Sequence, residues 1–83
     1  MKTDSSFLEL HSQLGKRIVY LRKEKKMSQL SLSIATGLSK SYLSELEKGK
    51  RNPSVDTLMK IVMALDITLE ELFRGIVPLE QLL

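Results

Sequence analysis

The sequence has no cysteine and a single histidine, His11, among its 83 residues. Without cysteine there is no disulfide framework, and one histidine offers no basis for a zinc site. Two Tyr, two Phe and no Trp cannot build a platform on which RNA bases stack. The longest apolar run, Ile61 to Leu65, is far too short to cross a membrane. We therefore expect a cytoplasmic domain with no cofactor and no metal.

Catalytic groups are also missing from the pattern. The carboxylates stand at expected helix-start or ion-pair positions, so they do not converge on a recognisable pocket. There is no glycine-rich phosphate loop and no metal-ligand spacing. These absences favour a binding protein and argue against an enzyme.

Positive charge is present, and it is concentrated in the first two thirds of the chain. Residues 16–51 carry ten Lys or Arg against three Glu, a balance of +7, whereas residues 54–83 have a balance of −3. Such a segment suits nucleic acid, although a solvated, lysine-rich helix face has the same composition. We expect a solubilising face at Lys16, Arg17, Lys23, Lys25 and Lys26.

Apolar residues recur at three- or four-residue spacing along the chain, which predicts helices. The length suits one domain, residues 1–83, with an all-α fold class. We expect five helices, at about residues 6–25, 29–36, 40–48, 54–65 and from 69 to just before Gly75. The second could be a short strand because Leu30, Leu32 and Ile34 alternate with serines, but its flanking helices favour a helix.

Residues suited to helix ends support these boundaries. Ser28 and Ser39 can cap the second and third helices, and Gly37 and Gly49 can end them. Pro53 with Ser54 marks the start of the fourth helix, and Thr68 with Glu71 forms a capping box for the fifth. The predicted core face of the fourth helix contains Val55, Leu58, Ile61, Val62 and Leu65.

The third predicted helix has two chemically different sides. At about 100° per residue, Leu43 and Leu46 point into the core. The opposite side carries Ser41, Ser44, Glu45 and Lys48. About 9 residues at about 1.5 Å each make a rod that fits a DNA major groove about 12 Å wide.

These features resemble the Cro/C1-type (XRE-like) helix-turn-helix domain. The resemblance covers residues 14–75 and rests on SQ at 28–29, Gly37, YLSELEKGKRNPS at 42–54 and ITLEELF at 67–73. It implies a lambda repressor-like bundle with the helix-turn-helix at residues 28–48. The third helix would enter the major groove while the start of the second helix contacts the backbone. The small size further resembles the controller proteins of restriction-modification systems and small phage or plasmid repressors.

The DNA-binding surface implied by this resemblance involves both helices and the following loop. Gln29 is either a phosphate contact or a plain helix-start residue, and Tyr42 either contacts phosphate or covers the core edge. Lys40, Ser41 and Ser44 are candidates for base contacts. The backbone candidates are Ser39, Lys48, Lys50, Arg51 and Asn52.

Two glutamates of the third helix have different expected roles. Glu45 either accepts from cytosine N4 or pairs with Lys48 or Lys40. Glu47 faces inward, and family geometry offers Arg22 as its partner in a structural ion pair. The pair contributes under about 1 kcal/mol if both side chains reach solvent. If it is buried, removal of one partner leaves the other poorly compensated, at a cost of about 3–5 kcal/mol.

The C-terminal part of the chain has more apolar surface than a small bundle needs. We predict a dimerisation segment at residues 67–83, through Ile67, Phe73, Ile76, Val77, Leu79, Leu82 and Leu83. A two-fold homodimer would place two recognition helices about 34 Å apart on an inverted-repeat operator. Alternatively, these residues cap their own core.

The expected function is a sequence-specific transcription regulator that binds double-stranded operator DNA as a homodimer and blocks or recruits RNA polymerase. The alternative is an antitoxin-like or adaptor protein–protein interaction module on the same fold. Steep salt dependence of DNA affinity would distinguish the first function from the second.

Overall fold

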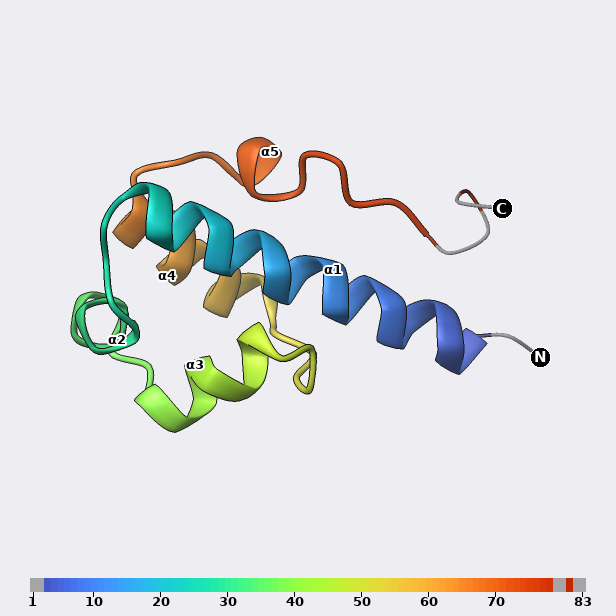
Figure 1. Ribbon diagram of the computed structural model, residues 1–83, viewed down its shortest axis with the longest axis horizontal. Coiled ribbons are helices and arrows are strands. Elements are labelled where there is room, and N and C mark those ends of the chain that lie inside the picture. The colour runs from blue at the N-terminus through green and yellow to red at the C-terminus, as the bar shows by residue number, and fades with distance from the viewer. Residues whose placement is uncertain (1–2, 79–80, 82–83) are drawn as a thin grey trace.

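The computed structural model describes residues 3–78 and 81, and over these residues it contains five α-helices (Figure 1). The helices are α1 (Thr3–Glu24), α2 (Gln29–Thr36), α3 (Lys40–Glu47), α4 (Val55–Leu65) and α5 (Leu69–Leu72). The predicted all-α fold class is confirmed, and the second helix is a helix and not a strand.

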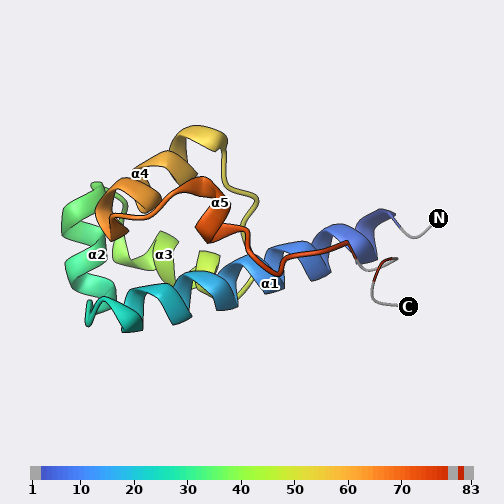
Figure 2. The same ribbon diagram turned by 90° about the horizontal axis from the view of Figure 1, so that it is seen from above.

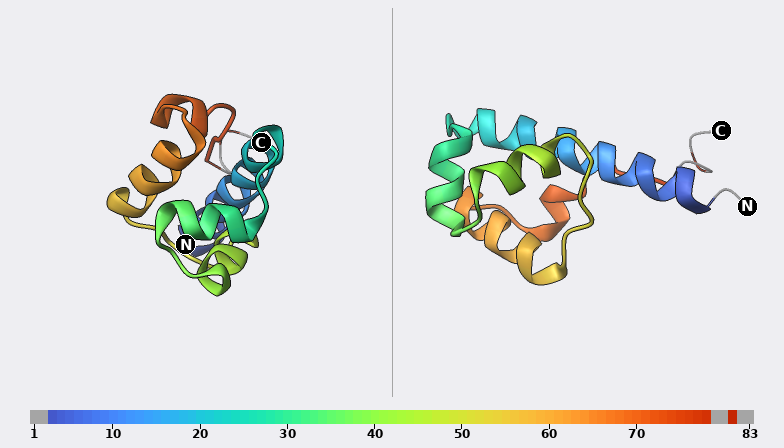
Figure 3. Two further views of the ribbon diagram at one scale, coloured as in Figure 1. Left: turned by 90° about the vertical axis from the view of Figure 1, so that its left-hand side faces the viewer. Right: turned by 90° about the horizontal axis from the view of Figure 1, so that it is seen from below.

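Helix α1 runs the length of the molecule, which measures 39 × 23 × 20 Å. Its C-terminal half packs against α3 and α5, while its N-terminal turns project beyond the other helices (Figures 1 and 2). The chain after α5 returns along α1 toward the end of the molecule at which α1 begins (Figure 2). Helices α3 and α5 lie on opposite sides of the bundle (Figures 1 and 3).

All five helices contribute aliphatic side chains to one core. The buried members are Leu14, Ile18, Leu21, Leu32, Leu43, Leu46, Leu58, Ile61, Val62, Leu65 and Leu72. Val55 was predicted to belong to this core, but it is 66% exposed because it begins α4 one turn before Leu58, the first buried residue of that helix. Phe7, in the first turns of α1, is also exposed.

The predicted caps are confirmed. The hydroxyls of Ser28, Ser39 and Ser54 each accept a hydrogen bond from a backbone N–H three residues later, at 3.0–3.1 Å. Thr68 and Glu71 bond each other reciprocally as a capping box. The helix ends differ modestly from prediction: α1 begins three residues earlier, and α3 ends at Glu47.

A close backbone contact joins α1 to α3. Gly15 is buried in α1, and a Cβ atom added to it would lie 2.6 Å from the carbonyl oxygen of Leu46. Gly49, at φ +78°, makes a similar approach to the Cα atom of Ser12. Only glycine at position 15 lets the two helices come this close. Helical spacing alone does not identify Gly15, because the reason for it lies on another helix.

Helix α1 also holds the C-terminal segment through two polar side chains. The Gln13 carboxamide donates to the carbonyl of Val77 at 2.9 Å and accepts from its N–H at 3.0 Å. Arg17 donates to the carbonyl of Glu71 at 2.7 and 3.1 Å. Arg17 is therefore a structural contact of α5 and not part of a purely solubilising face, because its guanidinium reaches the end of that helix.

Candidate DNA-binding surface

The outer side of α3 carries the polar group that the sequence predicts. Leu43 and Leu46 are fully buried, so they fix which side of the helix faces out. A shallow hollow on the outer side is lined by Gln29, Lys40, Ser41, Ser44, Glu45 and Lys48. Five of these six residues come from α3 and its end, and the sixth begins α2. The structure thus brings the predicted base-contact residues together with the start of α2.

The turn between α2 and α3 is held by two hydroxyl groups that precede Gly37 and bond to the backbone of Leu38, which follows it. Thr36 Oγ1 donates to the carbonyl of Leu32 at 2.7 Å and accepts from the N–H of Leu38 at 3.2 Å. Ser33 donates to the carbonyl of Leu38, whose side chain packs against the core. These bonds fix the angle between the two helices of the motif, and sequence reasoning did not identify them.

Beneath the surface, Arg22 and Glu47 form the predicted ion pair. Arg22 Nε and Nη2 donate to the two carboxylate oxygens of Glu47 at 2.7 and 3.0 Å. The side chains are only 10% and 5% exposed, so the solvent-exposed alternative is wrong. Arg22 Nη1 also donates to the carbonyl of Met27 at 2.9 Å. The pair therefore ties α1 to α3 and to the loop before α2.

Gln29 extends this buried network into α2. Its Nε2 donates to Glu47 Oε1 at 2.8 Å, so the residue is more than a plain helix-start residue. The sequence does not predict this bond, since it depends on how α2 and α3 cross. One carboxylate thus receives hydrogen bonds from α1 and from α2.

The second glutamate, Glu45, has a different partner from those predicted. Its Oε1 accepts from Arg51 Nε at 2.8 Å, so its partner in the ion pair is Arg51 and not Lys48 or Lys40. The chain folds back after α3, where the Lys50 N–H donates to the carbonyl of Glu45, and this brings Arg51 within reach. The Arg51 guanidinium also lies 5.1 Å from the centre of the Tyr42 ring. Tyr42 packs against the core, as one of its two predicted roles requires.

The basic residues around this cluster remain on the surface. Lys40, Lys48 and Lys50 are exposed, as are Ser39 and Asn52. Ser39 and Lys40 stand at the start of α3 and Lys48 and Lys50 follow its end, whereas Asn52 lies farther along the loop, where it lines an apolar cavity. Positive side chains in these positions can approach phosphates on both sides of a groove that receives the helix.

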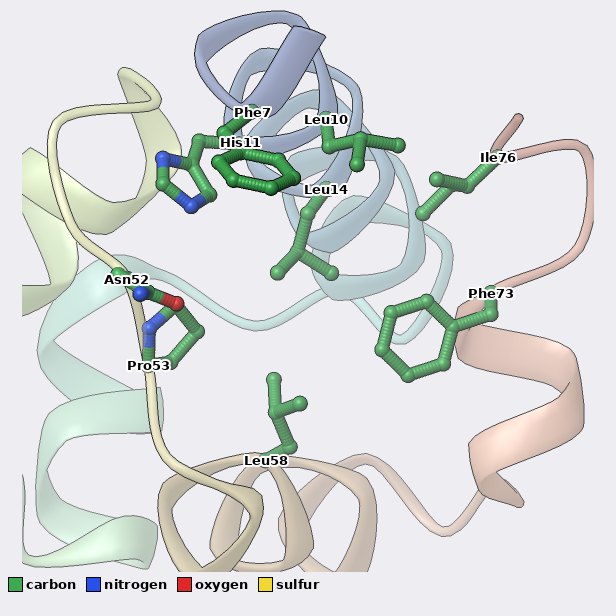
Figure 4. Close-up of a pocket in the computed structure, with 9 residues that line it drawn as sticks. All are labelled: Phe7, Leu10, His11, Leu14, Asn52, Pro53, Leu58, Phe73 and Ile76. Carbon is green, nitrogen blue, oxygen red and sulfur yellow. The ribbon is translucent and has the colours of Figure 1, made fainter. Parts of the chain in front are cut away.

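An apolar cavity of about 530 Å³ opens between α1, the loop that joins α3 to α4, α4 itself and the chain from the end of α5 onward (Figure 4). Its lining consists of Phe7, Leu10, His11, Leu14, Asn52, Pro53, Leu58, Phe73 and Ile76. Sequence reasoning did not predict it.

Among the described residues, no three His, Cys, Asp or Glu side chains gather as a metal site would require. No described helix has the length and hydropathy of a transmembrane span.

The predicted dimerisation residues fall into three groups. Ile67 and Ile76 pack against the chain's own core, as the alternative expectation has it. Phe73 is 40% exposed at the cavity, and Val77 is half-buried beside α1. Leu79, Leu82 and Leu83 lie outside the described residues.

Known proteins resemble this chain in sequence and in fold. The model of a family described as Helix-turn-helix matches residues 18–72. The uncharacterized HTH-type transcriptional regulator y4dJ of Sinorhizobium fredii is 37% identical over 65 residues, which cover 78% of this chain and 84% of that protein.

Two solved structures of controller proteins share the fold. The restriction-modification controller protein C.AhdI from Aeromonas hydrophila is 40% identical, with a TM-score of 0.74 over 76% of this chain and 96% of that one. The controller protein C.Esp1396I, in a structure of its tetramer with its natural 35 base-pair operator, is 28% identical. Its TM-score is 0.73, over 81% of this chain and 88% of that one.

Proposed function

Because the chain belongs to the helix-turn-helix family of transcription regulators, we propose that it binds a specific operator in double-stranded DNA and regulates transcription there. The observation that carries the proposal is the outer side of α3, where Ser41, Ser44 and Glu45 lie together above a buried Leu43 and Leu46. These groups can donate to or accept from base edges in a major groove. We assign the chain a binding role and no catalytic one.

In the proposed complex, α3 lies in the major groove and the start of α2 contacts the DNA backbone. The first backbone N–H groups of α2 suit a phosphate, because they have no partners within the helix. The Gln29 side chain is bonded to Glu47, so its proposed role is to hold the start of α2 in place. Ser39, Lys40, Lys48, Lys50 and Asn52 would surround α3 with phosphate contacts.

We further propose a homodimer that places two copies of α3 on an inverted repeat. One module discriminates only a few base pairs, at about 1–3 kcal/mol each, so two copies are needed for a selective site. Exposed Phe73 and the neighbouring apolar cavity are candidates for the subunit contact. The tetramer of C.Esp1396I on its operator is a precedent for assembly on DNA.

Occupation of the operator would block or recruit RNA polymerase, in the cytoplasm where the DNA lies.

The second candidate function is an adaptor or antitoxin-like module, and the observation that favours it is the apolar cavity, which could receive a segment of another protein.

Salt dependence of duplex affinity distinguishes the two functions. A protein that neutralises several phosphates loses affinity steeply as salt rises, because condensed counterions are released on binding. We expect Lys48→Ala to weaken binding to all duplexes similarly and to make the salt slope shallower by about one. Affinity that does not change with salt would remove the DNA proposal and favour the adaptor.

Sedimentation at micromolar concentration tests the homodimer. We expect a dimer, and Phe73→Ala is expected to weaken it because that ring is exposed beside the cavity. A chain that stays monomeric after operator DNA is added would end the dimer proposal.

A further inference from the structure

The contact between Glu45 and Arg51 changes the role of both residues at the proposed DNA surface. Each side chain is about half exposed, at 46% and 50%, so the pair stands on the surface and not in the core. The bond joins Glu45 Oε1 to Arg51 Nε at 2.8 Å. A carboxylate alone would be repelled by phosphates, whereas a carboxylate joined to a guanidinium has no net charge.

The pair also has a defined pattern of hydrogen-bonding groups. The bond to Glu45 uses one of the five N–H donors of Arg51, and the carboxylate has a second oxygen. The pair therefore offers an acceptor next to a group of donors. In the major groove, a C·G base pair presents the matching pattern, since cytosine N4 donates while guanine O6 and N7 accept.

We infer that Glu45 and Arg51 together recognise one C·G base pair in each half-site, with Glu45 accepting from cytosine N4 and Arg51 donating to guanine. This inference rests on the proposed DNA-binding function and makes Arg51 a specificity residue. Glu45 belongs to the outer side of α3, which that function places in the groove, and Arg51 reaches Glu45 from the following loop.

Tyr42 is the positioning residue of this unit. Its ring lies 5.1 Å from the guanidinium carbon of Arg51, a distance at which a cation is attracted to an aromatic face. Because Tyr42 packs against the core, its ring is a fixed support for the Arg51 side chain, which comes from the loop after α3. Its hydroxyl is not required for this role, so Tyr42→Phe and Tyr42→Leu are expected to behave differently.

The experiment uses the duplex that the wild-type protein selects from a random library. Each C·G pair of the site is replaced in turn by T·A, which exchanges the donor and acceptor positions that the unit needs. For each protein we measure the dissociation constant for the altered duplex and divide it by the dissociation constant for the selected duplex. The proteins are the wild type, Glu45→Ala, Arg51→Ala, Arg51→Lys and the double Glu45→Ala/Arg51→Ala variant. Lys50→Ala is the matched control, because Lys50 is an exposed cation next to Arg51.

We expect the wild-type ratio to be about tenfold or more at one base pair per half-site. Both alanine variants and the double variant should bring that same ratio close to one, with no further loss in the double variant. Arg51→Lys should also lose the ratio because lysine lacks the fork-shaped guanidinium. Lys50→Ala and Tyr42→Phe should keep the ratio, and Tyr42→Leu should lower it.

Three results would overturn the inference. Arg51→Ala could weaken all duplexes alike and keep the ratio, which would make Arg51 a phosphate contact. Glu45→Ala and Arg51→Ala could lose selectivity at different base pairs, or the selected site could lack a sensitive C·G pair. In each case the protein would still select an operator and the proposed function would stand, whereas that function fails only if the wild-type protein selects no site.

Discussion

Glu47 joins three parts of the bundle through one carboxylate. It accepts from Arg22 of α1 and from Gln29 of α2 while it belongs to α3, and its side chain is almost fully buried. A buried ion pair of this kind contributes little relative to a well-packed apolar pair, but breaking it leaves a buried charge uncompensated. The network therefore makes the relative placement of the two motif helices sensitive to single substitutions.

Glu47→Ala should lower the free energy of unfolding by about 3–5 kcal/mol, because Arg22 would remain buried without its partner. Urea denaturation followed by far-UV circular dichroism measures this, since the chain has no tryptophan. Glu24→Ala is the control, because that glutamate is exposed at the end of α1, and it should change stability by less than about 0.5 kcal/mol. Equal, small effects of both changes would show that the pair is not a structural link.

Gly15→Ala should destabilise the protein by about 1–3 kcal/mol, because the new methyl group would overlap the backbone of α3 near Leu46. Helix propensity alone predicts the opposite sign, since alanine is better than glycine inside a helix by about 1 kcal/mol. Thermal and urea denaturation decide between the two, with the exposed neighbour Lys16→Ala as control. A Gly15→Ala protein at least as stable as the wild type would refute the close packing of α1 on α3.

At the level of the helices, sequence predicts what is decided locally. The caps at Ser28, Ser39 and Ser54 follow from sequence because each hydrogen bond spans three residues. The inward faces of α3 and α4 follow from helical spacing, except at the start of α4, where Val55 lies before the covered part of the helix. The bonds Glu45–Arg51 and Gln29–Glu47 could not be predicted, because they depend on a loop path and on a crossing angle.

Ser39 offers a way to separate helix capping from DNA contact. Ser39→Ala should cost about 1 kcal/mol of stability, because its hydroxyl accepts from the N–H of Tyr42. Ser39→Asp keeps a capping oxygen and should leave stability within about 0.5 kcal/mol, but its charge should weaken DNA binding, most strongly at low salt.

The control for this experiment is the cap of α5, on the opposite side of the bundle from α3 (Figure 3). Thr68→Asp should leave DNA affinity almost unchanged. The affinities of Ser39→Asp and Thr68→Asp for the duplex are measured at two salt concentrations and compared. If both variants lose affinity equally, the effect is one of net charge and not of contact at the start of α3.

At the scale of the whole molecule, α1 connects the proposed subunit contact to the proposed DNA surface. Through Gln13 and Arg17 it holds the segment after α4, and through Arg22 it holds α3. The spacing of two recognition helices in a dimer would therefore depend on one continuous helix. Charge follows the same division, because eleven of the thirteen Lys and Arg residues lie in the first two thirds of the chain.

Selection of bound sites from a library of random duplexes tests the central claim most directly, since that claim is that the outer side of α3 recognises a DNA sequence. We predict an inverted repeat whose half-sites are centred about 34 Å, or about 10 base pairs, apart. Recovery of sequences no different from the starting library would contradict the claim.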